Sequence, residues 1–514
     1  MLVKTHGTAL LGIEAIPLQI EVNVSMGQGY AIVGLPDAAI RESLHRTESA
    51  IKSIGFKMPR TKLVINLAPA HIRKTGSGLD LPMALGILAA SEQIDQLDHL
   101  AHWLFMGELG LDGRLLGIRG ALSMAIQAKK MGLDGFVLPA ENEREASLLP
   151  QFSSIGFSHL SEVLSFLSAP SAHLQKKVMP IPAPTANHWG TDFSAIKGQE
   201  NVKRALEIAA AGSHNLVLIG PPGAGKTLLA KSLPSILPPL NERESLELTQ
   251  IHSVAGQGFS PTGLVSQRPF RSPHHSVSAI ALSGGGSKPQ PGEISLAHHG
   301  VLFLDELPEF NRAALETLRQ PLEEQCIHIS RAAQSLCFPA GFMLVAAMNP
   351  CPCGFYNHPE KKCQCGPGQI QRYLSKISGP LLDRIDLQVE VAPVPASALL
   401  QDRKGEDSTK VRQRVIQARE WQTKRIHNTQ AVLSKDYQLP HPMDAGMALD
   451  QCSKQLLKSA MEKLQLSARA YHRILKVGRT IADLEGSENL AAHHVSEAIQ
   501  YRSLDRVNWG KDQY

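Results

Sequence analysis

One run of eight residues combines the residue types and the spacing that phosphate binding requires. The run is Gly220, Pro221, Pro222, Gly223, Ala224, Gly225, Lys226 and Thr227. Its glycines allow backbone N–H groups to converge on an anion, its lysine can reach the outer phosphates of a nucleotide, and its threonine can ligate Mg²⁺. Because apolar runs at 215–219 and 228–233 flank it, the expected context is strand, loop and helix. The alternative is a chance glycine loop, which predicts no second half of a nucleotide site.

An acidic pair downstream supplies that second half. The apolar run 301–304 ends in Asp305 and Glu306, and α/β sheets place ligands at the carboxyl ends of such strands. We expect Asp305 to bind Mg²⁺ through water and Glu306 to polarise the water that attacks the terminal phosphate. An acidic pair after an apolar strand is common alone, but after a phosphate-binding loop it indicates ATP hydrolysis.

Three further side chains fit roles in the same reaction. Asn349 ends a third apolar strand, and its amide can orient the lytic water, although an asparagine before a proline is also a common turn former. Arg384 and Arg469 are candidates for the cations that neutralise charge on the transferring phosphoryl group. Such arginines can come from a neighbouring subunit. The alternative for either arginine is a structural ion pair.

Four cysteines within fifteen residues form a candidate metal site. Cys351, Cys353, Cys363 and Cys365 supply enough thiols for a tetrahedral zinc ion, which would pin a loop rich in glycine and proline. Paired C-x-C is less diagnostic than paired C-x-x-C, so reduced free thiols remain the alternative. The histidine pairs at 274–275 and 298–299 are expected to make local packing or loop contacts rather than to bind metal.

These residues need elements that bring them together, and the sequence predicts an α/β fold in three domains. Residues 1–168 alternate strand and helix patterns, and the proline-rich stretch 169–192 is typical of a linker. Residues 193–395 form a nucleotide-binding α/β core. Residues 396–514 have helical spacing and predict an all-helical lid. The stretch 283–292 is expected to be a loop, because neither helix nor sheet tolerates so much glycine and proline.

The bulk composition limits the class of protein. With 514 residues and 43% apolar content, the chain is long enough for about three ordinary domains. No aliphatic stretch approaches the roughly 20 residues of a membrane-spanning helix, and the first ten residues lack the order of a secretory signal. Seven cysteines suit reduced thiols or a metal in the cytoplasm better than a disulfide framework. The net charge of +5 neither demands nor excludes nucleic acid.

Taken in order, these parts resemble the ComM/YifB family, in the magnesium-chelatase-like branch of AAA+ ATPases. The likeness covers nearly the whole chain, and its most particular stretches are 268–275, 284–286, 291–298, 378–387 and 494–502. The resemblance implies a P-loop AAA+ domain with a helical lid. It also implies a homohexamer, promoted by nucleotide and DNA, that encircles single-stranded or branched DNA. Such a ring would move branch points while transforming DNA is recombined in natural competence.

The same resemblance implies roles for individual residues. Arg384 matches the arginine finger, Arg469 the second sensor and Asn349 the first sensor of the family. The glycine-rich stretch 283–292 would be a helix-2 insert and 325–338 a hairpin before the sensor strand, both pointing into a central channel. Phosphate binding needs positive or donor groups on such loops. The candidate DNA contacts are therefore Lys288, Arg331 and Gln334. Either cation could instead be merely solvated.

The first domain resembles the Lon-protease-like module, an α+β fold of the ribosomal S5 domain 2 type, most clearly at 107–114 and 135–142. A Lon-type protease uses a serine nucleophile that a lysine activates. Here Ser77 lies one place early against the family pattern, and Leu122 occupies the place of the lysine. Because the dyad cannot work without an amine base, we expect a non-proteolytic scaffold or a DNA-entry collar.

Three functions from different classes remain open at this point. The first is an ATP-dependent hexameric DNA helicase or translocase that uses ATP and Mg²⁺, and zinc if the four cysteines hold it. The second is an AAA+ motor that remodels a protein partner, as a metal-chelatase subunit does. The third is an ATP-dependent Lon-like peptidase. A complete nucleotide site together with channel loops favours the first.

Overall fold

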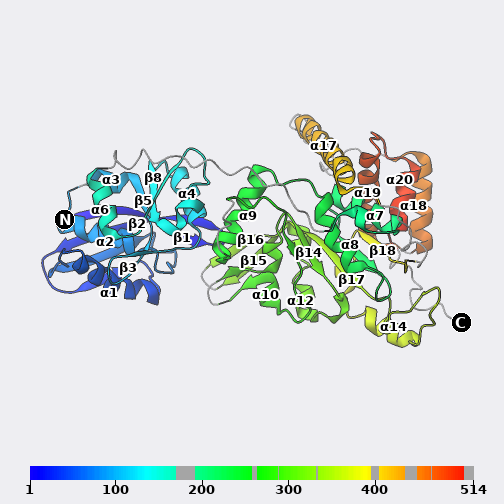
Figure 1. Ribbon diagram of the computed structural model, residues 1–514, viewed down its shortest axis with the longest axis horizontal. Coiled ribbons are helices and arrows are strands. Elements are labelled where there is room, and N and C mark those ends of the chain that lie inside the picture. The colour runs from blue at the N-terminus through cyan, green and yellow to red at the C-terminus, as the bar shows by residue number, and fades with distance from the viewer. Residues whose placement is uncertain are drawn as a thin grey trace. The chain divides into compact units, whose positions relative to one another are not determined.

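The computed structural model describes residues 1–95, 97–169, 191–257, 263–286, 289–331, 334–394, 405–433, 449–464 and 466–502. Within these segments the chain forms two compact units (Figure 1). The first contains Met1–Thr185, Glu242–Val265 and Ser330–Cys337, and the second contains Ala186–Asn241, Ser266–Ile329 and Phe338–Tyr514. In the same segments, no helix has both the length and the apolar character that crossing a membrane requires. The predicted domain boundaries stay predictions, because most of the expected linker, 170–190, falls outside these segments.

The first unit is built on a mixed seven-stranded sheet in the order β3-β4-β2-β1-β5-β8-β9. The strands are β1 (Leu2–Leu11), β2 (Glu14–Ser25), β3 (Tyr30–Val33), β4 (Lys62–Ala68), β5 (Trp103–Phe105), β8 (Gly135–Pro139) and β9 (Ser153–Phe157). β2 pairs antiparallel with β1 and β4, and the other neighbours pair in parallel. Alternate residues of β4 are buried, so one face of this part of the sheet is covered.

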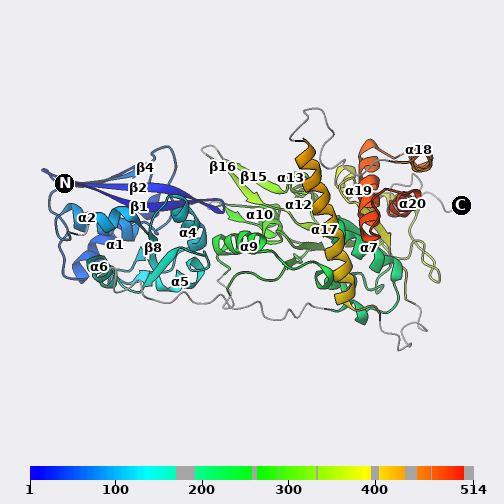
Figure 2. The same cartoon turned by 90° about the horizontal axis from the view of Figure 1, so that it is seen from above.

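Helices complete the first unit. They are α1 (Ala38–Ser53), α2 (Asp80–Ala90), α3 (Leu97–His102), α4 (Ala121–Lys130), α5 (Ala140–Ala146), α6 (Leu160–Ser168) and α9 (Glu242–Ala255), with a small ladder of β6 (Glu108–Leu109) and β7 (Leu115–Leu116). Figure 2 shows α1 and α2 on the same side of β1, β2 and β4. α2 is buried along its whole length, because it lies between the sheet and α1.

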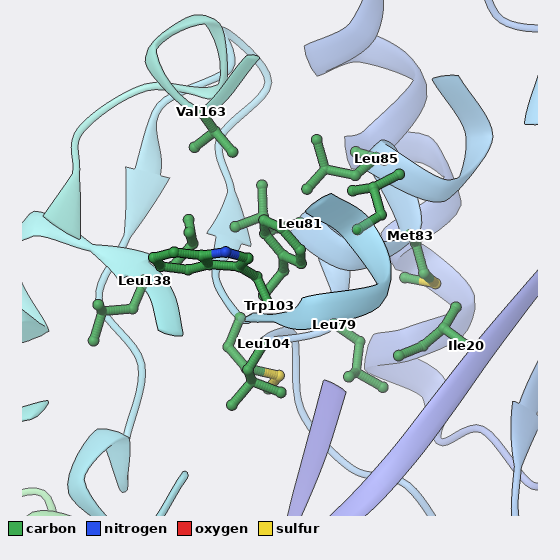
Figure 3. Close-up of a cluster of buried hydrophobic side chains, with 14 of the residues drawn as sticks. Ile20, Leu79, Leu81, Met83, Leu85, Trp103, Leu104, Leu138 and Val163 are labelled. Carbon is green, nitrogen blue, oxygen red and sulfur yellow. The ribbon is translucent and has the colours of Figure 1, made fainter. Parts of the chain in front are cut away.

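The core of the first unit gathers around Trp103. Its ring lies among aliphatic side chains from α2 and β8 (Figure 3). Phe166 meets the Trp103 ring edge-on at 4.9 Å between ring centroids. Gly135 leaves room for that ring, since a Cβ at this position would fall 2.4 Å from Trp103 Cζ3. An indole of this size buries enough apolar area to organise a small core around it.

The second unit holds a parallel five-stranded sheet in the order β11-β14-β17-β10-β18. The strands are β11 (Phe270–Arg271), β14 (Val301–Leu304), β17 (Met343–Met348), β10 (Leu216–Ile219) and β18 (Leu387–Glu390). Every residue of β10, β14 and β17 is buried. Continuous apolar strands of this kind are typical of a parallel sheet that is covered on both faces. The predicted α/β class with a parallel nucleotide-binding sheet is therefore confirmed.

Short helices surround this sheet, and the tail is helical. The first group is η2 (Phe193–Ala195), α7 (Glu200–Gly212), α8 (Lys226–Ser232), η3 (Leu233–Ile236), α10 (Ala279–Ser283), α11 (Glu293–Leu296), η4 (Leu307–Glu309), α12 (Arg312–Glu316), α13 (Pro321–Glu324), α14 (Pro367–Leu374) and α15 (Gly379–Leu382). The tail contains α17 (Ser408–Leu433), α18 (Gln451–Leu464), α19 (Ala468–Leu484) and α20 (Ala492–Gln500). Ser467 starts α19 by accepting a hydrogen bond from the Ala470 N–H, as an N-cap serine does.

The two predicted inserts have different outcomes. Within the stretch 283–292, which was expected to be only a loop, β12 (Gly284–Gly285) pairs antiparallel with β13 (Gln290–Pro291), so that expectation is wrong. Gly284 and Gly285 have φ values of +91° and +124°, which glycine adopts without strain, and a Cβ on Gly284 would meet the Gln290 carbonyl at 2.5 Å. The hairpin expected at 325–338 is present as a two-stranded sheet of β15 (Cys326–Arg331) and β16 (Gln334–Pro339).

Candidate nucleotide-binding site

The glycine-rich loop follows β10 directly. The Gly220 N–H donates to the Met348 carbonyl at 3.2 Å, so the loop starts beside the end of β17. A Cβ on Gly220 would lie 2.3 Å from the Val391 carbonyl oxygen, which leaves no space for any other residue type. Gly223 and Gly225 have φ values of +79° and +84°, in the left-handed region. These turns present successive N–H groups along one concave line of backbone, a geometry that suits an anion.

Lys226 crosses the mouth of this loop. Its ammonium donates to the carbonyls of Gly220 at 2.7 Å and Pro221 at 2.9 Å, and to Asn349 Oδ1 at 3.1 Å. Burial lowers the pKa of Lys226, and the nearby carboxylates of Asp305 and Glu306 oppose that effect. The amine is thus held by neutral oxygens in a partly desolvated position, where a phosphate oxygen would be a stronger partner than any of the three.

Thr227 and Asp305 form the second contact of the site. The Thr227 hydroxyl donates to Asp305 Oδ2 at 2.8 Å, which brings the first residues of α8 against the end of β14. The other carboxylate oxygen, Oδ1, accepts from the Glu306 N–H at 3.0 Å. Both side chains offer oxygen ligands, which Mg²⁺ prefers, and both lie beside the lysine that faces the phosphates. The residues present therefore fit a magnesium ion that accompanies a nucleotide.

Glu306 leaves the line of its strand in a strained turn. Its φ is +54°, a left-handed conformation that is uncommon for a residue with a side chain. The carboxylate is 61% exposed and lies 3.5 Å from His275 Nδ1. The His275 ring in turn packs on His274, with 4.0 Å between ring centroids, and edge-on against Phe310. The histidine pair makes the local packing that was expected, and it also limits where the Glu306 carboxylate can go.

A cavity of about 450 Å³ opens beside Glu306 and Asn349. Its other walls come from Glu309 of η4, from Pro352 in the loop after β17, and from α14 with the residues just beyond it: Gln369, Arg372, Tyr373 and Lys376. Burial, followed by the Glu309 charge, raises the pKa of Tyr373 to about 12, so its hydroxyl stays protonated. Sequence reasoning missed the α14 wall. The spacing 369, 372, 373, 376 would have indicated one polar helix face.

Comparison with known proteins decides the family. Models of the magnesium chelatase subunit ChlI match residues 192–399 and 20–142, and the model of its C-terminal part matches 405–502. The chain is 43% identical over 505 residues to protein YifB of Escherichia coli. It is 42% identical over 513 residues to competence protein ComM of Haemophilus influenzae. Each alignment covers 98% of this chain and 97% of the relative.

The chain belongs to the ComM/YifB family of magnesium-chelatase-like AAA+ proteins. The predicted family is therefore confirmed. In this family member, the AAA+ sheet brings Lys226 against Asn349, and Thr227 against Asp305. Glu306 and Asn349 share the cavity described above. These five residues form one contiguous site, and their individual roles stay predictions.

The two candidate arginines, Arg384 and Arg469, both lie near carboxylates of their own chain. The Arg384 guanidinium is 8% exposed, pairs with Glu323 at 2.6 Å, and donates to the Pro380 carbonyl at 2.7 Å. Its Nε is buried and has no hydrogen-bond partner among the described residues. Arg469 is 63% exposed, and its nearest carboxylate, Asp383, is 4.0 Å away. Arg384 is thus in an ion pair within its own chain, and Arg469 is largely open to solvent.

The structure describes only part of the three candidate DNA contacts of the ComM/YifB chain. Lys288 lies outside the described residues. Arg331 is the last residue of β15 and Gln334 the first of β16, and only their backbone is described. These two residues therefore end neighbouring strands of one small sheet. Their contact with DNA stays a prediction.

The Gly220 geometry predicts the effect of one added methyl group. Gly220→Ala should push the Val391 carbonyl away and lower the stability of the β10–β18 pairing by about 1–3 kcal/mol, as overpacking does. Native-state hydrogen exchange of the β10 amides measures that loss locally. Gly368→Ala is the matched control, since a Cβ there meets nothing within 4 Å. If the β10 amides are equally protected from hydrogen exchange in both variants, the steric interpretation of Gly220 is wrong.

Proposed function

We propose that this ComM/YifB family member is an ATPase that binds ATP with Mg²⁺ on the loop 220–227. The observation that carries the proposal is the pair of contacts from consecutive residues: Lys226 to Asn349, and Thr227 to Asp305. Together they surround one position with an ammonium group, a hydroxyl, a carboxylate and an amide. A triphosphate with its metal is a ligand that uses all four.

The proposed reaction assigns a task to each side chain. Lys226 binds the outer phosphate oxygens, and Thr227 with Asp305 would hold Mg²⁺, which adds positive charge there. Glu306 accepts a hydrogen bond from the attacking water and takes its proton as the water oxygen bonds to the γ-phosphorus. The bond from that phosphorus to the bridging oxygen breaks, and the oxygen leaves with ADP. The Asn349 amide would orient the same water through its Nδ2 group, while its Oδ1 accepts from the Lys226 ammonium at 3.1 Å. Charge that develops on the phosphoryl oxygens is stabilised by the fixed N–H groups of the loop.

The proposed wider role is that of a hexameric cytoplasmic DNA helicase or translocase that drives branch migration while transforming DNA is recombined. Its support is the 42% identity to a protein named for competence, over nearly the full length of both chains. Hydrolysis on one protomer would be completed by Arg384 from the next, and Arg469 would sense the nucleotide from the lid. Residues 1–168 would serve as a Lon-protease-like scaffold or DNA-entry collar.

Two alternatives come from other classes. A motor that remodels a protein partner is supported by the match to magnesium chelatase subunit models along most of the chain. A peptidase has less support. The Ser77 hydroxyl contacts the Glu108 carboxylate, and Leu122, at the place of the expected lysine, is fully buried in α4. A carboxylate alone is a weak substitute for the amine base of a serine–lysine dyad.

Replacing Glu306 tests the ATPase directly. Glu306→Gln removes the water-activating carboxylate but keeps the shape, so steady-state ATP turnover should fall by about 10²–10³-fold while nucleotide affinity stays within a few-fold. Glu309→Gln is the matched control, because it lines the same cavity and its only described ion pair is an exposed one with Lys376 at 3.1 Å. The proposal fails if both variants turn over ATP like the parent chain.

DNA dependence separates the wider role from its alternatives. Forked or branched DNA should stimulate ATP turnover several-fold, and the stimulation should fall steeply as salt rises, because phosphate contacts release counterions. An ATP turnover rate that does not change when DNA is added would count against the translocase. Pull-down with Glu306→Gln protein distinguishes a DNA partner from a protein partner. Casein degradation that Ser77→Ala abolishes would instead support the peptidase.

Arg384 offers a test of action across a subunit boundary. Arg384→Ala should lower ATP turnover by up to about 10³-fold with ATP binding near normal, if its guanidinium reaches a neighbour's nucleotide. Mixing it with Lys226→Ala protein should restore part of the activity, since some joint interfaces regain a complete site. Glu323→Gln is the control that breaks the ion pair alone. Equal turnover loss in Glu323→Gln and no rescue on mixing would mean a structural role within one chain.

A further inference from the structure

Two separate C-x-C turns bring their four sulfurs to one point in the second unit. Cys351 Sγ lies 3.3 Å from Cys353 Sγ and 3.7 Å from Cys363 Sγ, and Cys353 and Cys363 are 3.6 Å apart. With Cys365, all four sulfurs lie within 4.8 Å of one another, and none is in a disulfide. A zinc ion with four thiolates at about 2.3 Å places its sulfurs about 3.8 Å apart. The observed spacing is close to that of a tetrahedral site.

The surroundings of the sulfurs suit a metal thiolate. The Cys365 N–H donates to Cys363 Sγ at 3.4 Å, a backbone hydrogen bond of the kind that orients a metal-ligating side chain. Lys361 and Lys362 precede Cys363, and the Lys361 ammonium lies 5.0 Å from the Phe355 ring on the same loop. Two lysines this close in sequence to a ligand would offset part of the net negative charge that four thiolates leave on a zinc site. Four thiolate ligands favour zinc over the oxygen-loving Mg²⁺.

Few apolar side chains pack with the cysteines of this loop. Between the end of β17 at Met348 and the start of α14 at Pro367, the structure contains no helix or strand. The fully buried apolar residues packed with the cysteines are few, Tyr356 and Ile370, with Leu374 partly covered. A loop this long with so small a core needs a cross-link or a metal to keep one conformation. The four converging thiols form a candidate site for such a metal ion.

The same loop connects three walls of the candidate nucleotide site. Asn349 is two residues before Cys351, and α14 begins two residues after Cys365. Asn349 and Tyr373 of α14 line the same cavity. Gly354, with φ +82°, packs so closely on the glycine-rich loop that a Cβ would fall 2.6 Å from Pro222 Cδ. A change in this loop therefore reaches the sensor amide, the cavity wall and the phosphate loop together.

We propose that Cys351, Cys353, Cys363 and Cys365 bind one structural Zn²⁺, and that this ion holds Asn349 and α14 in position against the phosphate loop. The metal-binding half stands on the sulfur geometry alone. The positioning half rests on the proposed ATPase function. The zinc ion contacts no nucleotide, so its cysteines are positioning residues. Loss of the metal should therefore reduce hydrolysis more than nucleotide binding.

Metal content tests the first half without any activity measurement. Protein purified without chelator and dialysed should hold about one zinc per chain by elemental analysis. Cys353→Ser and Cys365→Ser should hold much less, while Cys452→Ser, an exposed cysteine on α18, should hold as much as the parent. Cobalt substitution should give the intense visible absorption of a tetrahedral thiolate site. Absent metal, iron in place of zinc, or equal zinc in all variants would overturn the assignment.

Removing the metal from folded parent protein tests the second half and avoids variants that fail to fold. Protein stripped of zinc by a chelator, then freed of the chelator and assayed with Mg²⁺, should turn over ATP about 10–100-fold more slowly, the range for losing a supporting shell. Its affinity for a fluorescent ATP analogue should change by less than about three-fold. Added Zn²⁺ should restore turnover. Gly354→Ala should keep its zinc but lose turnover, because its Cβ would clash with Pro222 Cδ and its φ of +82° is strained for alanine.

The outcomes of the two halves are distinguishable. If protein stripped of zinc hydrolyses ATP at the parent rate, the positioning role is wrong, even though the parent protein binds zinc. Parent protein that holds zinc but never hydrolyses ATP would refute the proposed function and leave the metal site standing. Equal loss of nucleotide binding and turnover on chelation would mean that the metal supports the whole fold of this unit rather than the sensor.

Discussion

The parallel register of three strands is the constraint on which the candidate site depends. Ile219 pairs with Met348, and Leu304 pairs with Ala346, so β10, β17 and β14 end near the same edge of the sheet. Neighbouring strands lie about 4.8 Å apart. The glycine-rich loop, Asn349 and the acidic pair therefore emerge side by side although they are distant in sequence. A slip of one residue in β17 would turn Asn349 to the other face and break its contact with Lys226.

A strained backbone turn sets the direction of the Glu306 side chain at the end of β14. An acidic residue that continued along β14 would point its carboxylate to one face of the sheet, in line with the strand's alternation. Glu306 instead turns left-handed at φ +54°, and the buried residues Leu307 and Pro308 of η4 hold that turn in place. A conformation of this kind costs about 1–3 kcal/mol and persists only where the surroundings enforce it. Here it directs the carboxylate into the cavity next to Asn349.

Much of this architecture could be predicted from local sequence, because long apolar runs and their periodicity reflect local packing. β14 has the bounds of the apolar run at 301–304, and β10 begins one residue inside the run at 215–219. The expectation that a stretch rich in glycine and proline forms only a loop failed at Gly284–Gly285. Glycine adopts a positive φ there that is compatible with strand pairing. The α14 cavity wall and the Glu323 partner of Arg384 depend on tertiary packing, which no local pattern encodes.

The ion pair of Arg384 bears on how a shared active site could switch. Its guanidinium is nearly buried, whereas the Glu323 carboxylate is 49% exposed, so the pair lies at the border of the fold. Ion pairs between exposed groups contribute about 1 kcal/mol or less, and water competes in the same way for the half-exposed Glu323 carboxylate. A triphosphate offers more charge and bidentate oxygens, which a guanidinium binds more tightly than a single carboxylate. In the proposed ring, a neighbour loaded with nucleotide would compete for Arg384, and Glu323 would hold the arginine away from that position until the neighbour arrives.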